Sequence, residues 1–345
     1  MKRLIPIILI LFFIAGCSIK IGGSTSNDLG IYRSDDFGKK WQQKVYAGRI
    51  KKKELKISDI SVNKIIPSPD KEMLYICTAG RGIYKSDNLG DIWQETGLKS
   101  GTYVDVAFDG ENKDIIYTAS KGRIYKSVNA GKNWDVKYIE AEPGRTITDV
   151  ATDYYDSKRI YAATNTGAII KSDDYGNTWQ ILNNLNTYIS EMFFDPYDSR
   201  IIYIKTKNNL YISYDKGLTW HGLRVALKDY KGASSIKSIS FNMLDTSEFY
   251  ISTNYGILKT ENRGESFKPV KTLVNFGTSI NQVALDPENP EIIYIIRSNK
   301  FHKSINSGEE WETKILPTSG SISDIEIIPR EKDTNPILIS VYKNK

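Results

Sequence analysis

The chain has 345 residues, of which 40% are hydrophobic and 26% are charged, and its formal net charge is +6. That apolar content is enough to bury a large core, and the length alone suggests about two domains. With only two histidines and two cysteines, the composition gives no support to zinc chemistry, because zinc sites need clusters of these ligands.

The N-terminus has the zones of an exported precursor: two basic residues, an apolar run over 4–14 and a small-residue cleavage site, Ile14-Ala15-Gly16-Cys17. The apolar run is too short to span a bilayer, which takes roughly 20 residues. The cleavage site resembles the lipobox of bacterial lipoproteins, with Ile14 where Leu is commoner. The resemblance implies cleavage before Cys17 and acylation of its sulfur and its freed amine. An ordinary signal peptide with an incidental cysteine is the alternative.

These features divide the chain into a lipoprotein signal peptide (1–16), a lipidated cysteine with a flexible tether (17–28) and a folded part (29–345). Two or three acyl chains hold a protein at a membrane, whereas one gives only marginal binding. We therefore expect an exported protein, anchored to the outer face of the cytoplasmic membrane or to an outer membrane. Cys77 then has no disulfide partner, and we expect it to be a small buried residue.

One short pattern, S-x-D/N-x-G-x-x-W, recurs seven times, and its starting residues are separated by 41 to 52 positions. This spacing is typical of four-stranded propeller blades. The seven copies are Ser34-Asp36-Gly38-Trp41, Ser86-Asn88-Gly90-Trp93, Ser127-Asn129-Gly131-Trp134, Ser172-Asp174-Gly176-Trp179, Ser213-Asp215-Gly217-Trp220, Thr260-Asn262-Gly264-Phe267 and Ser304-Asn306-Gly308-Trp311.

Each copy is expected to form a tight turn in which the hydroxyl and the Asp or Asn oxygen accept backbone N–H groups and the glycine supplies a positive φ. Four copies carry Asn, which keeps the oxygen but loses the charge, so the turn needs an acceptor and not a metal-binding anion. The aromatic residue is expected to pack between blades. All six tryptophans occupy this position, which leaves none for a sugar-stacking platform.

Short β-rich segments recur around each copy, with no helical period, and predict strands A, B and C before the box and strand D from its aromatic residue. The strand-A segments begin at Val62, Tyr103, Ile147, Ile189, Ile236, Ile280 and Ile322. The chain begins with a C strand and box and ends with A and B strands, so each end supplies half a blade. We predict an all-β, single seven-bladed propeller closed by pairing of these two ends, which hides the sheet edges.

The repeated pattern resembles the Asp-box, or BNR repeat, of sialidases, xyloglucanases, sortilin-type receptors and the photosystem II stability and assembly factor family. The resemblance covers nearly the whole folded part. Assembly-factor-like proteins are the nearest match, because they are single seven-bladed propellers, often lipoproteins, that act as binding chaperones. Sortilin-type ectodomains differ in having ten blades and a cysteine-rich module. The resemblance specifies a fold and leaves function open.

Enzyme chemistry has weak support. Sialidases use an arginine triad and an R-I-P motif before the first box, whereas the closest string here is Ile327-Ile328-Pro329-Arg330, after the last one. Xyloglucanases use two propellers, and a glycosidase needs two carboxylates flanking one bond. The only candidate group of carboxylates is the strand-A acids, which we expect near the central channel. For these side chains, turn capping or solvation in the channel is favoured over catalysis or cation binding. They are Asp105, Asp149, Glu191 and Asp324.

Charge is divided between the two predicted faces. Acids predominate in the A–B turns, whereas the B–C hairpins are basic, and the D–A loops add further cations that include Lys51, Lys52 and Lys53. We hypothesise that the basic face docks a partner. Solvated loop lysines are the alternative reading. The candidate docking residues are Arg81, Lys121, Arg123, Lys207, Arg297 and Lys300.

The sequence therefore predicts a non-catalytic, monomeric binding or assembly protein of the cell envelope, without cofactor or metal. Its expected partners are an envelope protein or an anionic polymer, together with the membrane through the lipid anchor. Nucleic acid is a poor candidate because export separates the protein from it. The rival class is a cell-surface glycan-binding or glycoside-hydrolase-like propeller, which surplus aromatic residues and paired carboxylates over one channel mouth would favour.

Overall fold

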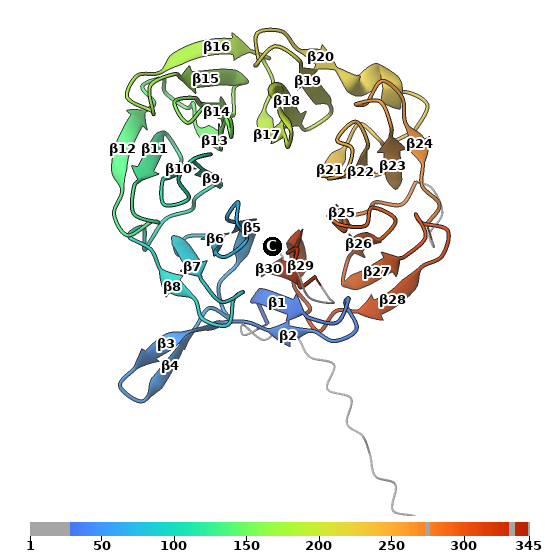
Figure 1. Ribbon diagram of the computed structural model, residues 1–345, viewed down its shortest axis with the longest axis horizontal. Helices are drawn as coiled ribbons and strands as arrows, with labels where there is room; N and C mark the ends of the chain where they lie inside the picture. The colour runs from blue at the N-terminus through green and yellow to red at the C-terminus, as the bar shows by residue number, and fades with distance from the viewer. Residues whose placement is uncertain (1–27, 273–276, 331–334, 344–345) are drawn as a thin grey trace, which may run out of the picture.

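The computed structural model describes residues 28–272, 277–330 and 335–343. Cys17 and nearly all of the predicted tether lie outside these ranges. Seven four-stranded antiparallel sheets, the blades, stand around a central axis (Figure 1). This arrangement confirms the predicted all-β, seven-bladed propeller.

Blades 1 to 6 follow one another from β5 to β28, and blade 7 combines the two ends of the chain. The innermost strands, A, are β5 (Val62–Pro67), β9 (Val106–Phe108), β13 (Ile147–Thr152), β17 (Ile189–Asp195), β21 (Ile236–Phe241), β25 (Gln282–Leu285) and β29 (Ser321–Ile327). The B strands are β6 (Leu74–Thr78), β10 (Ile116–Ser120), β14 (Ile160–Thr164), β18 (Asp198–Thr206), β22 (Phe249–Thr253), β26 (Ile293–Arg297) and β30 (Ile337–Tyr342).

The C and D strands complete each blade toward the rim. The C strands are β7 (Ile83–Ser86), β11 (Arg123–Ser127), β15 (Ala168–Ser172), β19 (Leu210–Ser213), β23 (Ile257–Thr260), β27 (Lys300–Ser304) and β1 (Gly30–Ser34). The D strands are β8 (Gln94–Glu95), β12 (Asp135–Ile139), β16 (Gln180–Asn184), β20 (His221–Gly222), β24 (Lys268–Pro269), β28 (Glu312–Ile315) and β2 (Gln42–Gln43).

Ring closure takes place in blade 7, whose strand order is β2-β1-β30-β29. The first strand of the chain pairs with the last along its whole length, from Gly30 opposite Val341 to Ser34 opposite Ile337. Ring closure by the two chain ends is therefore confirmed. Because β1 and β30 satisfy each other's backbone groups, neither of these two strands is left as an unpaired edge.

The B strands form the core between blades. Six B strands carry a buried tyrosine at an equivalent position. Three of these tyrosines donate a hydrogen bond from the phenolic hydroxyl to a backbone carbonyl in the box turn of the following blade. These bonds, each of 3.2 Å, run from Tyr75 to Ala130, from Tyr117 to Tyr175 and from Tyr161 to Lys216. These bonds satisfy a buried polar group and fix the register of one blade on the next.

The seven box turns share one hydrogen-bond pattern, shown here by the copy that begins at Ser172. The backbone N–H of Gly176 donates to the Ser172 hydroxyl at 2.9 Å, and the N–H of Thr178 donates to Oδ1 of Asp174 at 2.8 Å. Two consecutive residues adopt positive φ, Tyr175 at 62° and Gly176 at 83°, where the sequence analysis assigned this conformation to the glycine alone. A non-glycine side chain tolerates the left-handed region at some cost, and the hydrogen bonds offset that strain.

The propeller has two faces. The box face carries the A–B turns and the Asp-boxes, and the hairpin face carries the B–C hairpins and the D–A connections. The chain enters the ring on the hairpin face, because Gly30 is paired with Val341, at the B–C end of strand B. There the Asp28 carboxylate accepts the backbone N–H of Ser319 at 2.6 Å. None of the helices in the described ranges has the length and hydrophobicity that crossing a bilayer requires.

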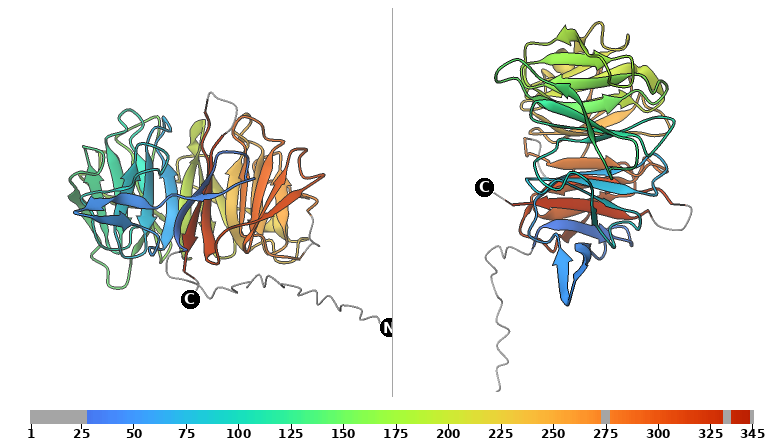
Figure 2. Two further views of the ribbon diagram at one scale, coloured as in Figure 1. Left: turned by 90° about the horizontal axis from the view of Figure 1, so that it is seen from below. Right: turned by 90° about the vertical axis from the view of Figure 1, so that its left-hand side faces the viewer.

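Two local features differ from the sequence-based expectation. In blade 2 strand A was expected to begin at Tyr103, but it begins to pair with strand B only at Val106. The residues around Lys51, expected in a D–A loop or in a flexible insertion, lie in the D–A connection between blades 7 and 1. They form a hairpin there, made of β3 (Tyr46–Ile50) and β4 (Lys53–Lys56). This hairpin, here called the arm, projects outward from the rim beside blades 7 and 1 (Figures 1 and 2).

Candidate functional site

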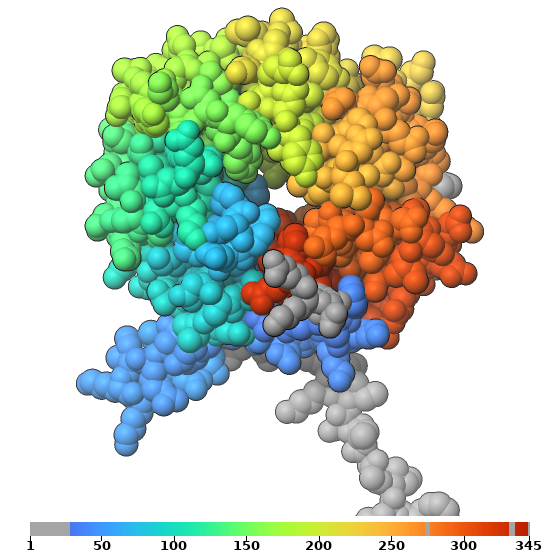
Figure 3. Space-filling view, viewed as in Figure 1, coloured from blue at the N-terminus to red at the C-terminus, as the bar shows by residue number. Residues whose placement is uncertain are grey.

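A channel runs along the axis of the ring and is open in the space-filling view (Figure 3). Its main cavity has a volume of about 640 Å³ and is lined chiefly by strand-A residues. Each blade contributes one polar side chain at the third position of its strand-A segment, within the pattern apolar-x-polar-apolar. In five blades a register shift in the A–B pairing falls immediately before this position. The channel ring so formed consists of Lys64, Asp105, Asp149, Glu191, Ser238, Gln282 and Asp324.

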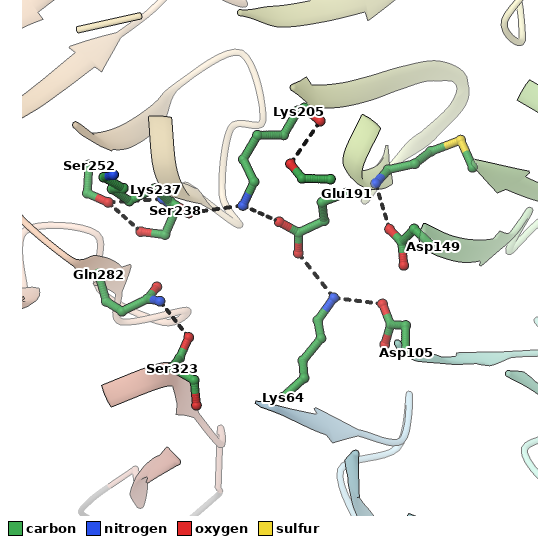
Figure 4. Close-up of polar contacts among 12 residues, drawn as sticks. Lys64, Asp105, Asp149, Glu191, Lys205, Lys237, Ser238, Ser252, Gln282 and Ser323 are labelled. Carbon is green, nitrogen blue, oxygen red and sulfur yellow. Dashed lines mark hydrogen bonds and ion pairs between the residues drawn. The ribbon is translucent and has the colours of Figure 1, made fainter. Parts of the chain in front are cut away.

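Lys64 is the only cation of the channel ring and bridges two of its carboxylates. Its ammonium lies 2.6 Å from Oδ2 of Asp105 and 3.1 Å from Oε1 of Glu191 (Figure 4). The second oxygen of Glu191 lies 2.6 Å from the ammonium of Lys205, which also donates to the backbone carbonyl of Lys237 at 2.9 Å. Lys205 belongs to the B strand β18 and precedes a B–C hairpin, and its side chain lines the channel cavity.

The other two acids of the channel ring bind backbone. Oδ2 of Asp149 accepts the N–H of Met192 at 2.6 Å, and Oδ2 of Asp324 accepts the N–H of Ile65 at 3.0 Å. In both cases the donor belongs to the next blade. The four strand-A acids predicted near the channel are thus brought together there, and all four are engaged in contacts between blades.

Burial controls the protonation of these groups. It raises the pKa of Asp149 well above its usual value, and it raises that of Asp324 to about 6 against the opposing effect of the Ile65 N–H. Glu326, two residues further along β29, has its pKa raised to about 8 by burial and by the nearby Asp324. Glu191 shows the opposite balance: Lys205 and Lys64 outweigh burial and lower its pKa.

The four acids of the channel ring make contacts between blades. A glycosidase needs one carboxylic acid and one free carboxylate on opposite sides of a bond. Two of the four acids of the channel ring are neutralised by lysine and two are held by backbone N–H groups. Within the described ranges, no group of three or more His, Cys, Asp or Glu side chains is placed to hold a metal ion.

Lys64 and Glu326 are channel residues that were not predicted from the sequence. A signal existed for Lys64, because aligning the strand-A segments places it in the same column as the four acids. Glu326 lies two residues beyond that column, where the other blades have mostly apolar residues or serine, and no pattern distinguished it.

The six predicted docking residues all lie at the B–C hairpins of the hairpin face. Arg81, Lys121 and Arg123 come from blades 1 and 2, Lys207 from blade 4, and Arg297 and Lys300 from blade 6. All are exposed except Arg297, which is half-buried. No ion pair involves any of the six within the described ranges. The six described hairpin tips, 79–82, 121–122, 165–167, 207–209, 254–256 and 298–299, contain no carboxylate.

The box face has the opposite character, since many of its cations are paired with carboxylates. Lys113 contacts Asp70 and Glu72, and Arg159 contacts Asp153, Asp156 and Asp173. The guanidinium of Arg200 lies 2.7 Å from Asp198, and the ammonium of Lys259 lies 2.8 Å from Glu248. Part of the positive charge of the box face is therefore compensated locally, whereas the six predicted docking residues make no ion pair within the described ranges.

The box face also carries exposed tyrosines in its A–B turns. Tyr154 and Tyr155 lie in the A–B turn of blade 3, and Tyr197 lies in that of blade 4. Their exposed fractions are 48%, 64% and 59%. The Tyr197 hydroxyl donates to the carbonyl of Met243 in the A–B turn of blade 5 at 2.8 Å. Aromatic rings exposed in this way are one of the two features expected of a glycan-binding propeller.

The family model for the BNR-Asp box repeat matches residues 31–44, the first of the seven copies. Among curated proteins, the chain is similar to the xyloglucanase Xgh74A of Acetivibrio thermocellus, with 31% identity over 162 residues. That match covers 40% of this chain and 19% of the relative, so the chain spans about a fifth of the xyloglucanase.

Among solved structures, YCF48 from Cyanidioschyzon merolae matches with a TM-score of 0.63 and 14% identity, over 82% of this chain and 95% of that protein. A structure of YCF48 bound to D1 peptide matches with a TM-score of 0.64 and 12% identity, over 82% and 93% of the two chains. At these identities the similarity shows the fold alone. It agrees with the resemblance to assembly-factor-like propellers.

Proposed function

We propose that the protein is a non-catalytic binding and assembly protein of the cell envelope, exported and anchored through lipid on Cys17. In this proposal the hairpin face docks an acidic segment of an envelope protein. The observation that carries it is the set of six cations at the B–C hairpins, none of which forms an ion pair with a carboxylate of the described residues. Because their charge is uncompensated, they are available to a ligand.

Two further observations support a binding role. The four acids of the channel ring are engaged in holding blades together, so they are poor candidates for acid and base catalysis. The YCF48 structure, of similar fold, has been determined with a bound peptide. A propeller of this size offers a rigid platform on which several hairpins contact one extended partner at once.

The test is partner capture by crosslinking in intact cells. Replacing Arg81, Lys121, Arg297 and Lys300 with Glu should abolish capture. The matched control reverses four exposed lysines of the box face, Lys39, Lys40, Lys132 and Lys158, which changes the net charge equally and should leave capture intact. Unchanged capture by the first variant, or equal loss in both, would contradict docking on the hairpin face.

A second candidate function, glycan binding, is favoured by the exposed tyrosines of the box face and by the partial similarity to xyloglucanases. Exposed rings stack on sugar faces, and the locally paired charges of the box face suit a neutral polysaccharide. Titration with xyloglucan oligosaccharides distinguishes the two functions. Binding that is lost in Tyr155→Ala and Tyr197→Ala would support this candidate, and release of reducing ends would establish hydrolysis.

A further inference from the structure

The arm is an exposed basic ribbon whose tip has no role in the core. All residues from 49 to 56 are exposed, and the tip residue Ile50 is 61% exposed. The arm is secured at its base. The buried residues Val45 and Ile57 are joined there by a backbone hydrogen bond of 2.9 Å, and the carbonyl of Tyr46 accepts the N–H of Trp93 at 2.8 Å. An isolated two-stranded hairpin gains little stability from its own packing, so an apolar residue at its tip is not explained by folding.

The charges of the arm are unequally compensated. Glu54, its only carboxylate, is shared between Arg49 at 3.4 Å and Lys56 at 3.1 Å. Lys51 and Lys52 form the turn, and Lys53 begins β4 opposite Ile50; none of the three makes an ion pair within the described ranges. The tip thus combines three uncompensated ammonium groups with an exposed aliphatic side chain.

The arm also lies where the chain enters the fold. The N–H of Leu29 donates to the carbonyl of Ser58 at 3.0 Å, immediately after the base of the arm. A Cβ on Gly30 would lie 2.8 Å from Val45 and 3.0 Å from the carbonyl of Ile57, which shows how closely these segments pack. If Cys17 carries lipid, the 11 positions from it to Asp28 reach at most roughly 40 Å when fully extended, so the arm stays near the membrane surface.

We propose that the arm binds anionic lipid headgroups, with its lysines on the phosphates and Ile50 entering the headgroup layer. A bilayer is favoured over a protein because a two-stranded ribbon has no concave wall to select a peptide, whereas a charged surface needs only basic residues and an apolar tip. This contact surface is separate from the B–C hairpins assigned to partner docking.

The test uses unlipidated chain from Ser18 onward, which contains every strand of the closed ring. Its binding to mixed phosphatidylcholine–phosphatidylglycerol vesicles is compared with its binding to pure phosphatidylcholine. We expect selective binding to the anionic vesicles. Lys52→Glu with Lys53→Glu should weaken it at least about tenfold, since each lysine near an anionic surface is worth about fivefold in affinity.

The matched control, Lys121→Glu with Arg123→Glu, makes the same charge change on the hairpin face and should keep vesicle binding. Equal binding by the arm variant, or loss through the control pair, would overturn the proposal. Loss of partner capture in the arm variant with unchanged vesicle binding would also overturn it and would assign the arm to a protein. Failure of hairpin-face docking is measured separately, by crosslinking.

A spectroscopic readout places the tip directly. When Ile50→Cys is labelled with an environment-sensitive dye, the fluorescence emission of the dye should shift to the blue on anionic vesicles. Val128→Cys, a 60% exposed position on the box face, should not shift. A shift at Val128 alone, or at neither position, would contradict insertion of the tip.

Discussion

The ammonium of Lys64 lies 2.6 Å from the carboxylate of Asp105, although the two residues are 41 positions apart and belong to neighbouring blades. Lys64 also reaches Glu191, 127 positions away, so one side chain connects three blades across the axis. Burial opposes its charge, but the two carboxylates outweigh that effect and hold the pKa of Lys64 well above its usual value. A single cation therefore links distant parts of the ring.

Replacing Lys64 with Met should destabilise the propeller by about 1–3 kcal/mol. Breaking a fully buried ion pair costs about 3–5 kcal/mol, and the channel exposure of Lys64, 28%, reduces that figure. Urea denaturation measures the change. Adding Asp105→Asn to the Lys64 variant should recover most of the loss, because it removes the carboxylate left without a cation, whereas Glu191 keeps its ion pair with Lys205. Equal stability of the Lys64 single variant and the wild type would contradict a stabilising bridge.

Because the channel holds buried carboxyl groups with raised pKa values, we predict that the stability of the protein declines between about pH 5 and 8. Glu326 has a pKa of about 8 in the folded state and near its ordinary value when unfolded, so the folded state binds more protons in this interval. Stability should therefore fall as pH rises through the interval and level off above it. Asp324, with a pKa of about 6, acts in the same direction.

The measurement is the melting temperature as a function of pH for the wild type and Glu326→Gln. The variant should have a flatter profile and melt a few degrees higher at pH 8, since about 1 kcal/mol corresponds to a few degrees in a domain of this size. Superimposable profiles would show that Glu326 does not titrate abnormally.

The box turns need a hydroxyl more than a negative charge. Ser172 is buried, and its oxygen accepts the N–H of Gly176, so Ser172→Ala leaves a buried donor unsatisfied at a cost of about 1–3 kcal/mol. Asp174→Asn keeps the oxygen that accepts the N–H of Thr178 and should change stability by less than about 0.5 kcal/mol. Chemical denaturation of both variants checks this order. Equal losses would contradict it.

Lipid attachment is tested at Cys17. In cells supplied with radiolabelled palmitate, the wild-type protein should incorporate label and fractionate with membranes. Cys17→Ser should incorporate none and accumulate as uncleaved precursor, because the lipoprotein peptidase requires the modified cysteine. Cys77→Ser is the matched control and should behave like the wild type, since Cys77 is fully buried. Labelling that persists in the Cys17 variant would refute lipidation at this position.

Sequence reasoning succeeded where the determinants are local and repeated. Each box specifies its own turn through hydrogen bonds between residues two to four positions apart, so seven boxes predicted seven blades. The split of one repeat between the chain ends predicted that the ring closes where β1 pairs with β30. It was weaker where the period is interrupted. The interval around Lys51 shows only a basic run in the sequence, and whether this run lies on a face or projects from the rim depends on how residues 45 and 57 pack.

The repeat by itself determined the fold class, the number of blades and the place where the ring closes, because these follow from short-range turn chemistry and from the alternation of buried residues. Only the tertiary structure decided which of the channel acids meet Lys64, which are held by backbone N–H groups, and which cations remain unpaired. The reason is geometric: strand-A side chains from different blades meet only at the axis, and their partners are set by the closed ring and not by neighbours in the chain.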